Sequence, residues 1–145
     1  AIPELTIDPI PCAAAIVQSL QTIVSRRVSA LESAVVSVTM FNSGSALNVI
    51  PGTAHLGGTA RSFSADIRKL LEDAIRDVAT ATAQAYGCKI EFDWQPGYPP
   101  TVNHAAQAGR AASVAATVLG DGSIITDIAP SMGAEDFDLY AEVVK

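Results

Sequence analysis

Residues 42–61 read NSGSALNVIPGTAHLGGTAR and give the strongest indication of the fold. The first half is a loop rich in Gly and Ser that carries a turn signal at Pro51-Gly52. The second half alternates as a strand does, with Ala54, Leu56, Gly58 and Ala60 on one face and His55, Gly57, Thr59 and Arg61 on the other. Residues 34–41 alternate in the same way, with Val36, Val38 and Met40 sharing a face. The stretch therefore predicts two strands joined by a long loop.

Helical periodicity flanks these strands on both sides. Apolar residues at steps of three and four predict a helix over residues 8–28, carried by Ile10, Ala13, Val17, Leu20, Val24 and Val28. A second helix over residues 65–86 has a wider apolar stripe, made of Ile67, Leu70, Leu71, Ala74, Ile75, Val78 and Ala85. Asp8 and Ser64 suit the N-caps, and Gly87 suits the left-handed residue after the second helix.

Residues 89–94 alternate cleanly and predict a third strand, with Ile90, Phe92 and Trp94 opposite Lys89, Glu91 and Asp93. The order is then helix, strand, strand, helix, strand. Each helix has one apolar stripe and each strand one apolar face. The economical solution is a two-layer α+β fold in which both helices cover one face of an antiparallel sheet. This is a ferredoxin-like pattern whose first strand is absent.

The last third of the chain has a different character. Residues 95–100 form a Pro- and Gly-rich connector. An alanine-rich helix is expected over about residues 104–119, capped by Asn103 and ended by Gly120, with a short strand over 123–128 and a final helix from near Glu135. The flat alanine face of the first helix predicts close contact with a large neighbouring surface.

Composition excludes several classes of function. A chain of 145 residues suits one domain, or one domain with part of another. The net charge of −6 argues against binding to nucleic acid or to an anionic membrane surface. No apolar run approaches the roughly 20 residues that span a bilayer. Cys12 and Cys88 belong to no CxxC pair, so two reduced cysteines and a cytoplasmic location are expected, although a disulfide between them stays open.

Two polar residues of the opening stretch are candidates for binding a ligand. Asn48 offers an amide in the loop, and Arg61 offers a planar fork of donors at the strand end, so together they suit a carboxylate. The alternatives are a turn residue bonded to its own backbone for Asn48 and a solvated strand-end charge for Arg61. His55 and His104 have no ligand spacing that indicates zinc, so the residues of this chain predict no metal site.

Five motifs in order resemble one family: the zinc-dependent amidohydrolases and carboxypeptidases of the aminoacylase type, nearest to the hippurate and indole-acetyl-amino-acid hydrolases. The residues that carry the resemblance are Thr6-Ile7-Asp8-Pro9-Ile10, Asn48-Val49-Ile50-Pro51, Gly58-Thr59-Ala60-Arg61, Tyr98-Pro99-Pro100-Thr101-Val102-Asn103 and Gly133-Ala134-Glu135-Asp136-Phe137. The resemblance covers essentially the whole chain.

The resemblance implies a domain organisation. Residues 5–98 look like the lid domain that usually mediates homodimerisation in this family. Residues 103–145 look like the return of the chain into a catalytic domain. The family's metal ligands lie upstream of the lid and near the C-terminus, so the chain is read as a fragment that is inactive alone, whereas the parent enzyme binds a divalent metal, with zinc expected.

The resemblance also implies a substrate and its contacts. The parent enzyme would cleave N-acyl amino acids or similar amide conjugates, with Asn48 and Arg61 on the substrate carboxylate. Glu135 and Asp136 either interact favourably with the dipole of the helix that they begin or line the catalytic cleft. The alternative to a lid is a stand-alone ferredoxin-like module that dimerises or binds a small ligand without catalysis.

Overall fold

The computed structural model describes residues 2–133 and 135–136. The chain divides into two compact units, residues 1–96 and 97–145. The first unit contains the short 3-10 helix η1 (Pro3–Leu5), α1 (Pro9–Arg27), β1 (Ala34–Ser43), β2 (Ala54–Ser62) and α2 (Ala65–Ala85). The second contains α3 (Ala105–Leu119) and the 3-10 turn η2 (Asp121–Ser123).

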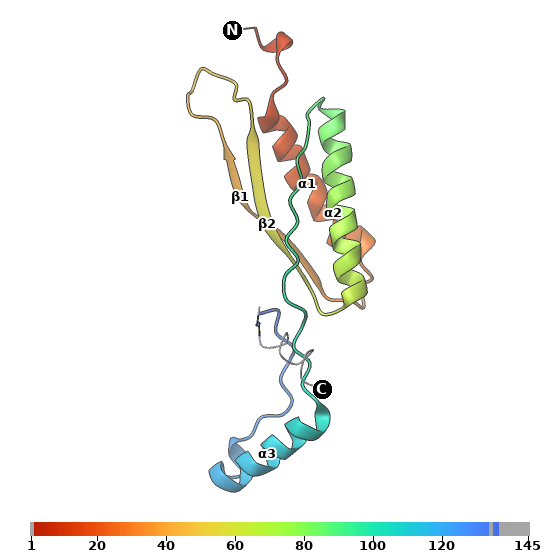
Figure 1. The fold of residues 1–145 in the computed structure, drawn as a ribbon, viewed down its shortest axis with the longest axis vertical. Helices are drawn as coiled ribbons and strands as arrows, with labels where there is room; N and C mark the ends of the chain where they lie inside the picture. The colour runs from red at the N-terminus through yellow and green to blue at the C-terminus, as the bar shows by residue number, and fades with distance from the viewer. Residues whose placement is uncertain (1, 134, 137–145) are drawn as a thin grey trace. The chain divides into compact units, whose positions relative to one another are not determined.

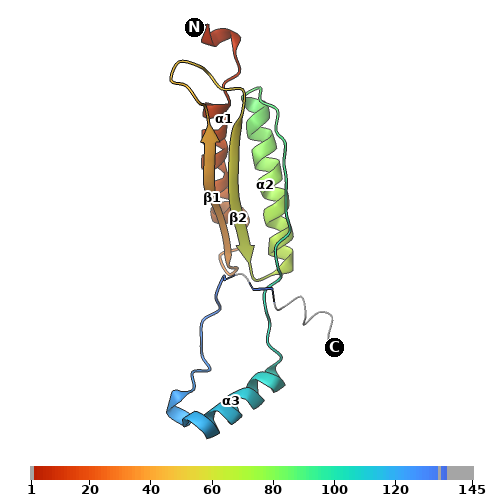
Figure 2. The same cartoon turned by 60° about the vertical axis from the view of Figure 1, so that its left-hand side comes forward.

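The first unit has the two-layer α+β arrangement that the sequence predicts. β1 and β2 pair antiparallel, and α1 and α2 pack together over one face of this sheet (Figures 1 and 2). The two helices run in opposite directions, so the first turn of α1 lies at the same end of the layer as the last turn of α2. Both predicted N-caps are confirmed: the Asp8 carboxylate accepts from the Ile10 N–H at 2.9 Å, and the Ser64 hydroxyl accepts from the Ile67 N–H at 3.4 Å.

The core lies where α1 and α2 pack against each other and against one face of the sheet. Its centre is formed by Ile23 and Leu71, which are 0% and 1% exposed. The other buried members are Cys12, Ile16, Leu20, Ala74, Ala79 and Ala83. The stripe predicted for α1 was therefore partly wrong, because Ile10 is exposed and the buried face runs through Cys12, Ile16 and Ile23 instead.

A β-bulge corrects the predicted face of Met40. The register between β1 and β2 shifts between Val38 and Met40, so Met40 lies opposite Gly57 rather than continuing the inner row of Val36 and Val38. Paired residues share a face of an antiparallel sheet. Met40 therefore covers Gly57 on the outer face, with its Sδ atom 3.3 Å from the place where a Cβ of Gly57 would lie.

The predicted strand over residues 89–94 is wrong as a strand, although its alternation is confirmed. Cys88, Ile90, Phe92 and Trp94 are half-buried, and the residues between them are exposed. The segment runs back along α2 (Figures 1 and 2), where the Phe92 and Trp94 rings stack with centroids 6.3 Å apart. A strand needs a neighbour with which to exchange backbone hydrogen bonds. Among the described residues β2 pairs only with β1, so the extended segment packs on side chains instead.

The second unit confirms the alanine-rich helix and overturns the strand after it. α3 begins after His104, not after the predicted cap Asn103, and the His104 side chain makes no capping hydrogen bond. Gly120 ends the helix with φ +86°, as predicted. Residues 123–128, predicted as a strand, contain the end of a 3-10 turn followed by irregular chain, because the described part of this unit offers them no partner strand. The final helix predicted from near Glu135 lies mostly outside the described residues.

Candidate functional site

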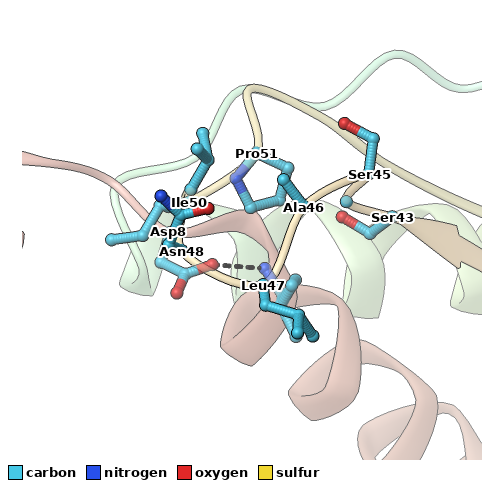
Figure 3. Close-up of a pocket in the computed structure, with 11 residues that line it drawn as sticks. Asp8, Ser43, Ser45, Ala46, Leu47, Asn48, Ile50 and Pro51 are labelled. Atoms are coloured by element: carbon cyan, nitrogen blue, oxygen red, sulfur yellow. Dashed lines mark hydrogen bonds between the residues drawn. The ribbon is translucent and has the colours of Figure 1, made fainter.

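A concave surface of the first unit lies between the β1–β2 loop and the start of α1. It is an open hollow of about 740 Å³ whose walls are residues 43–51 together with Asp8 and Ile10. Figure 3 shows the loop passing over the first turn of α1, with Asp8 at the helix start. The Ser43 hydroxyl donates to the Thr53 carbonyl at 2.7 Å and closes the base of the loop. Gly44 takes φ +73°, a conformation that favours glycine where the chain leaves β1.

Asn48 lies in this loop and lines the hollow, as its place in the sequence indicates (Figure 3). The neighbouring Leu47 and Val49 are exposed apolar side chains. A loop that presents an amide between exposed apolar groups is suited to contact a second surface, because apolar groups gain from leaving water.

Asp8 also lines the hollow. The sequence predicts it only as the N-cap of the first helix and gives no signal for this second position. Its carboxylate accepts from the Ile10 N–H and so occupies the positive end of the α1 dipole. A carboxylate ligand next to Asp8 would meet a like charge. In a single protomer, therefore, the hollow is a poor carboxylate site on the side that faces α1.

Arg61 lies at the other end of β2. It is half-buried and pairs with Val35 near the start of β1, whereas Asn48 lies beyond Ala54, where β2 begins. The seven steps from Ala54 to Arg61 correspond to about 23 Å at roughly 3.3 Å per residue. One protomer therefore does not bring Asn48 and Arg61 to the same small carboxylate. His55 pairs with Asn42 at the loop end of β2, so it too lies far from Arg61.

Glu135 and Asp136 belong to the second unit, where both are exposed. The Glu135 carboxylate accepts from the Asp136 backbone N–H at 3.0 Å. Over residues 2–133 and 135–136, no three or more His, Cys, Asp or Glu side chains gather as a metal site would need. The described residues therefore do not fit a metal centre, and no chemical step in this chain is assigned to one. None of the described helices is long and apolar enough to cross a membrane.

Comparison with known proteins places the chain in a family. Residues 1–87 match the model of the peptidase dimerisation domain. The chain belongs to the peptidase dimerisation domain family. Its relatives include an N-acetylcysteine deacetylase of Bacillus subtilis, 41% identical over 99% of this chain, and the IAA-amino acid hydrolase ILR1-like 2 of Arabidopsis thaliana, 38% identical over 99%. A hippurate hydrolase of Campylobacter jejuni is 35% identical over 99%.

Solved structures agree with these relatives. The Bacillus subtilis YXEP protein, described as a dinuclear metal binding peptidase from the M20 family, is 37% identical over 95% of this chain, with a TM-score of 0.73. A putative aminohydrolase from methicillin resistant Staphylococcus aureus is 25% identical over 99% of the chain, with a TM-score of 0.79. The chain spans only about a third of each of these proteins: 37% of the deacetylase, 33% of the plant hydrolase and 35% of the YXEP protein.

Proposed function

We propose that this chain is the lid and dimerisation region, with an adjoining catalytic-domain segment, of a metal-dependent amidohydrolase that cleaves N-acyl amino acids or similar amide conjugates. The observation that carries the proposal is that relatives named for amide hydrolysis match it over 99% of its length. That match continues beyond residue 87, where the dimerisation domain model ends. A stand-alone dimerisation or binding module would not need a shared tail, so the tail favours the hydrolase.

Residues 5–98 are proposed as the lid and residues 103–145 as part of the catalytic domain. Asn48 and Arg61 are proposed to contact the substrate carboxylate. Because they lie at opposite ends of β2, the proposal needs two copies of the chain, with Asn48 of one protomer and Arg61 of its partner approaching one substrate. The exposed apolar side chains beside Asn48 support this, since they would gain from contact with a second surface.

Glu135 and Asp136 are proposed to line the cleft. The metal, for which zinc is the candidate, is proposed to be bound by parts of the parent enzyme other than the described residues, which hold no suitable cluster. When bound, such an ion activates water for attack on the amide carbonyl. A cytoplasmic location is proposed from cysteine usage, since Cys12 and Cys88 belong to no CxxC pair.

A domain exchange tests the proposal. The segment of the Bacillus subtilis N-acetylcysteine deacetylase that aligns with this chain is replaced by residues 1–145, and hydrolysis of N-acetylcysteine and of hippurate is measured. The chimera is expected to form dimers and to hydrolyse an N-acyl amino acid. The 145-residue chain alone is expected to show no hydrolysis and to retain no zinc after dialysis. A folded, dimeric but inactive chimera contradicts the hydrolase assignment and favours the module without catalysis. Turnover by the isolated chain with one tightly bound zinc contradicts its assignment as a lid.

A further inference from the structure

The two cysteines of the chain lie at the same end of the helical layer. Cys12 lies in the first turn of α1, and Cys88 follows the end of α2. These ends lie side by side because the helices run antiparallel (Figures 1 and 2). Cys12 is 4% exposed and belongs to the core, and the half-buried Cys88 packs against that core. Both are free thiols.

A tight turn directs Cys88 toward α1. Gly87 takes φ +69°, and the Cys88 N–H donates to the Ala83 carbonyl at 2.9 Å, so the chain folds back over the last turn of α2. On its other side the turn meets the chain that leads into α1, since the Ile7 Cδ1 atom lies 3.8 Å from where a Cβ of Gly87 would be.

The thiols also affect one another directly. Burial raises the pKa of the Cys12 thiol from its ordinary value of 9.0 to about 11, and the neighbouring Cys88 thiol acts in the same direction. The turn and the packing therefore place both thiols against the same core at one end of the helical layer, with Cys88 the more accessible.

We propose that Cys12 and Cys88 form a thiol–disulfide exchange site that reacts with low-molecular-weight disulfides and closes to a reversible Cys12–Cys88 disulfide. The Cys88 thiolate attacks one sulfur of the small disulfide R–S–S–R, which forms Cys88–S–S–R and releases R–S⁻. Cys12 then loses its proton to solvent and its sulfur attacks the Cys88 sulfur, which releases the second R–S⁻. The protein loses two electrons and two protons, and the small disulfide is reduced to two thiols.

The order of these steps follows from exposure. Cys88 is reached from solvent, whereas Cys12 is buried and reacts only with a sulfur already held beside it. The resulting bond would join the first turn of α1 to the end of α2. That turn also carries Ile10 and follows Asp8, both of which line the hollow beneath the β1–β2 loop. Oxidation would therefore restrict the movement of the first turn of α1, which forms one wall of the candidate site.

Glutathione disulfide serves as the probe, applied to the reduced 145-residue chain. Intact mass spectrometry is expected to show a monomer two hydrogens lighter, with no lasting glutathione adduct, and peptide mapping should join residues 12 and 88. Because the bond closes a long loop, the melting temperature should rise by roughly 10 °C or more and return with dithiothreitol.

Matched single variants separate the two roles. Cys12→Ala should accumulate one glutathione on Cys88, because no second thiol resolves the adduct. Cys88→Ser should stay unmodified while folded, because Cys12 is buried. A stable glutathione adduct on the wild-type chain, or a disulfide between chains on a non-reducing gel with no internal bond, overturns the proposal. Both of these contrary results are observed on the wild-type chain itself. The test therefore does not depend on how well the variants fold.

Discussion

The Arg76 guanidinium carbon lies 4.3 Å from the centre of the Phe92 ring, which joins the extended segment after α2 to the helix that precedes it. Arg76 also lies 3.5 Å from Glu72 on the same helix. The Phe92 ring stacks on Trp94. Residues 89–94 pair with no strand among the described residues, so side-chain contacts hold this segment against α2. A cation over an aromatic face contributes about 0.5–1 kcal/mol where it is partly exposed.

A double-mutant cycle between Arg76 and Phe92 should therefore give a coupling of about 0.5–1 kcal/mol in the free energy of unfolding. Arg76→Gln and Phe92→Leu are suitable single changes, measured by urea denaturation. Glu72→Gln is the control, since its surface ion pair with Arg76 is expected to contribute less. Coupling near zero would show that Phe92 is held by Trp94 and by burial alone.

The sequence predicts most of the first unit, because its signals are local. Periodicity, the caps Asp8 and Ser64 and the turn glycine Gly87 each depend on a few neighbouring residues. The misses arise where distant residues decide the structure. Alternation over residues 89–94 shows an extended chain with one apolar side, but only a neighbouring strand makes such a chain part of a sheet. The bulge that turns Met40 outward likewise depends on its pairing with Gly57.

The candidate site could be predicted only in its parts. Asn48 was placed in a loop and Arg61 at a strand end, and both placements are confirmed. Whether both residues could bind the same carboxylate could not be predicted from their separation of thirteen residues. That number does not say whether the chain folds back on itself or continues in one direction. Here it runs on along β2. Asp8 was missed as a wall because a long loop folds over it from far along the chain.

Gly58 is expected to be required for the bulged pairing. A Cβ at this position would overlap the carbonyl oxygen of Ser37, which is backbone and moves only with its strand. Gly58→Ala should therefore destabilise the chain by about 1–3 kcal/mol in urea denaturation. Gly52→Ala is the control, since nothing lies within 4 Å of its Cβ position, and its cost should stay within about 0.5 kcal/mol. Equal stabilities for the two variants would mean that the bulge relaxes without cost.

The stability of the reduced chain should fall as the pH rises from about 9 to about 11. The Cys12 pKa is raised from 9.0 to about 11 in the folded chain, so between these values the unfolded chain has lost a proton that the folded chain keeps. The stabilisation is complete below pH 9 and is lost as the pH rises through 11, with a total on the order of 2 kcal/mol. The readout is the difference in unfolding free energy between wild type and Cys12→Ala at each pH, which removes the contributions of other groups. A difference that does not change with pH would contradict the raised pKa.

The isolated chain is expected to self-associate through the sheet. Among the described residues β1 and β2 each pair with only one strand, so each keeps an edge of unpaired backbone donors and acceptors. Such edges pair readily with another chain. Light scattering over a dilution series should show dimers that dissociate at low concentration, and hydrogen exchange in β1 or β2 should slow as the dimer forms. A monomer at every concentration, with strand protection unchanged, would contradict association through an edge.

Arg61→Lys in the deacetylase chimera tests the proposed substrate contact with little change in charge. Lysine keeps the positive charge but lacks the planar fork that binds a carboxylate through two hydrogen bonds. Arg61 is half-buried, so lysine also preserves more of its packing than alanine does. Hydrogen bonds to charged groups contribute about 1.5–3 kcal/mol, so kcat/KM on an N-acyl amino acid should fall by roughly ten- to a hundredfold. On the matched substrate in which an amide replaces the carboxylate, the loss in kcat/KM should be small. The control Arg27→Lys, on the exposed end of α1, should leave kcat/KM unchanged on both substrates. Equal losses on both substrates, or a large drop in melting temperature, would make Arg61 a structural residue of β2 and would leave the carboxylate to another group.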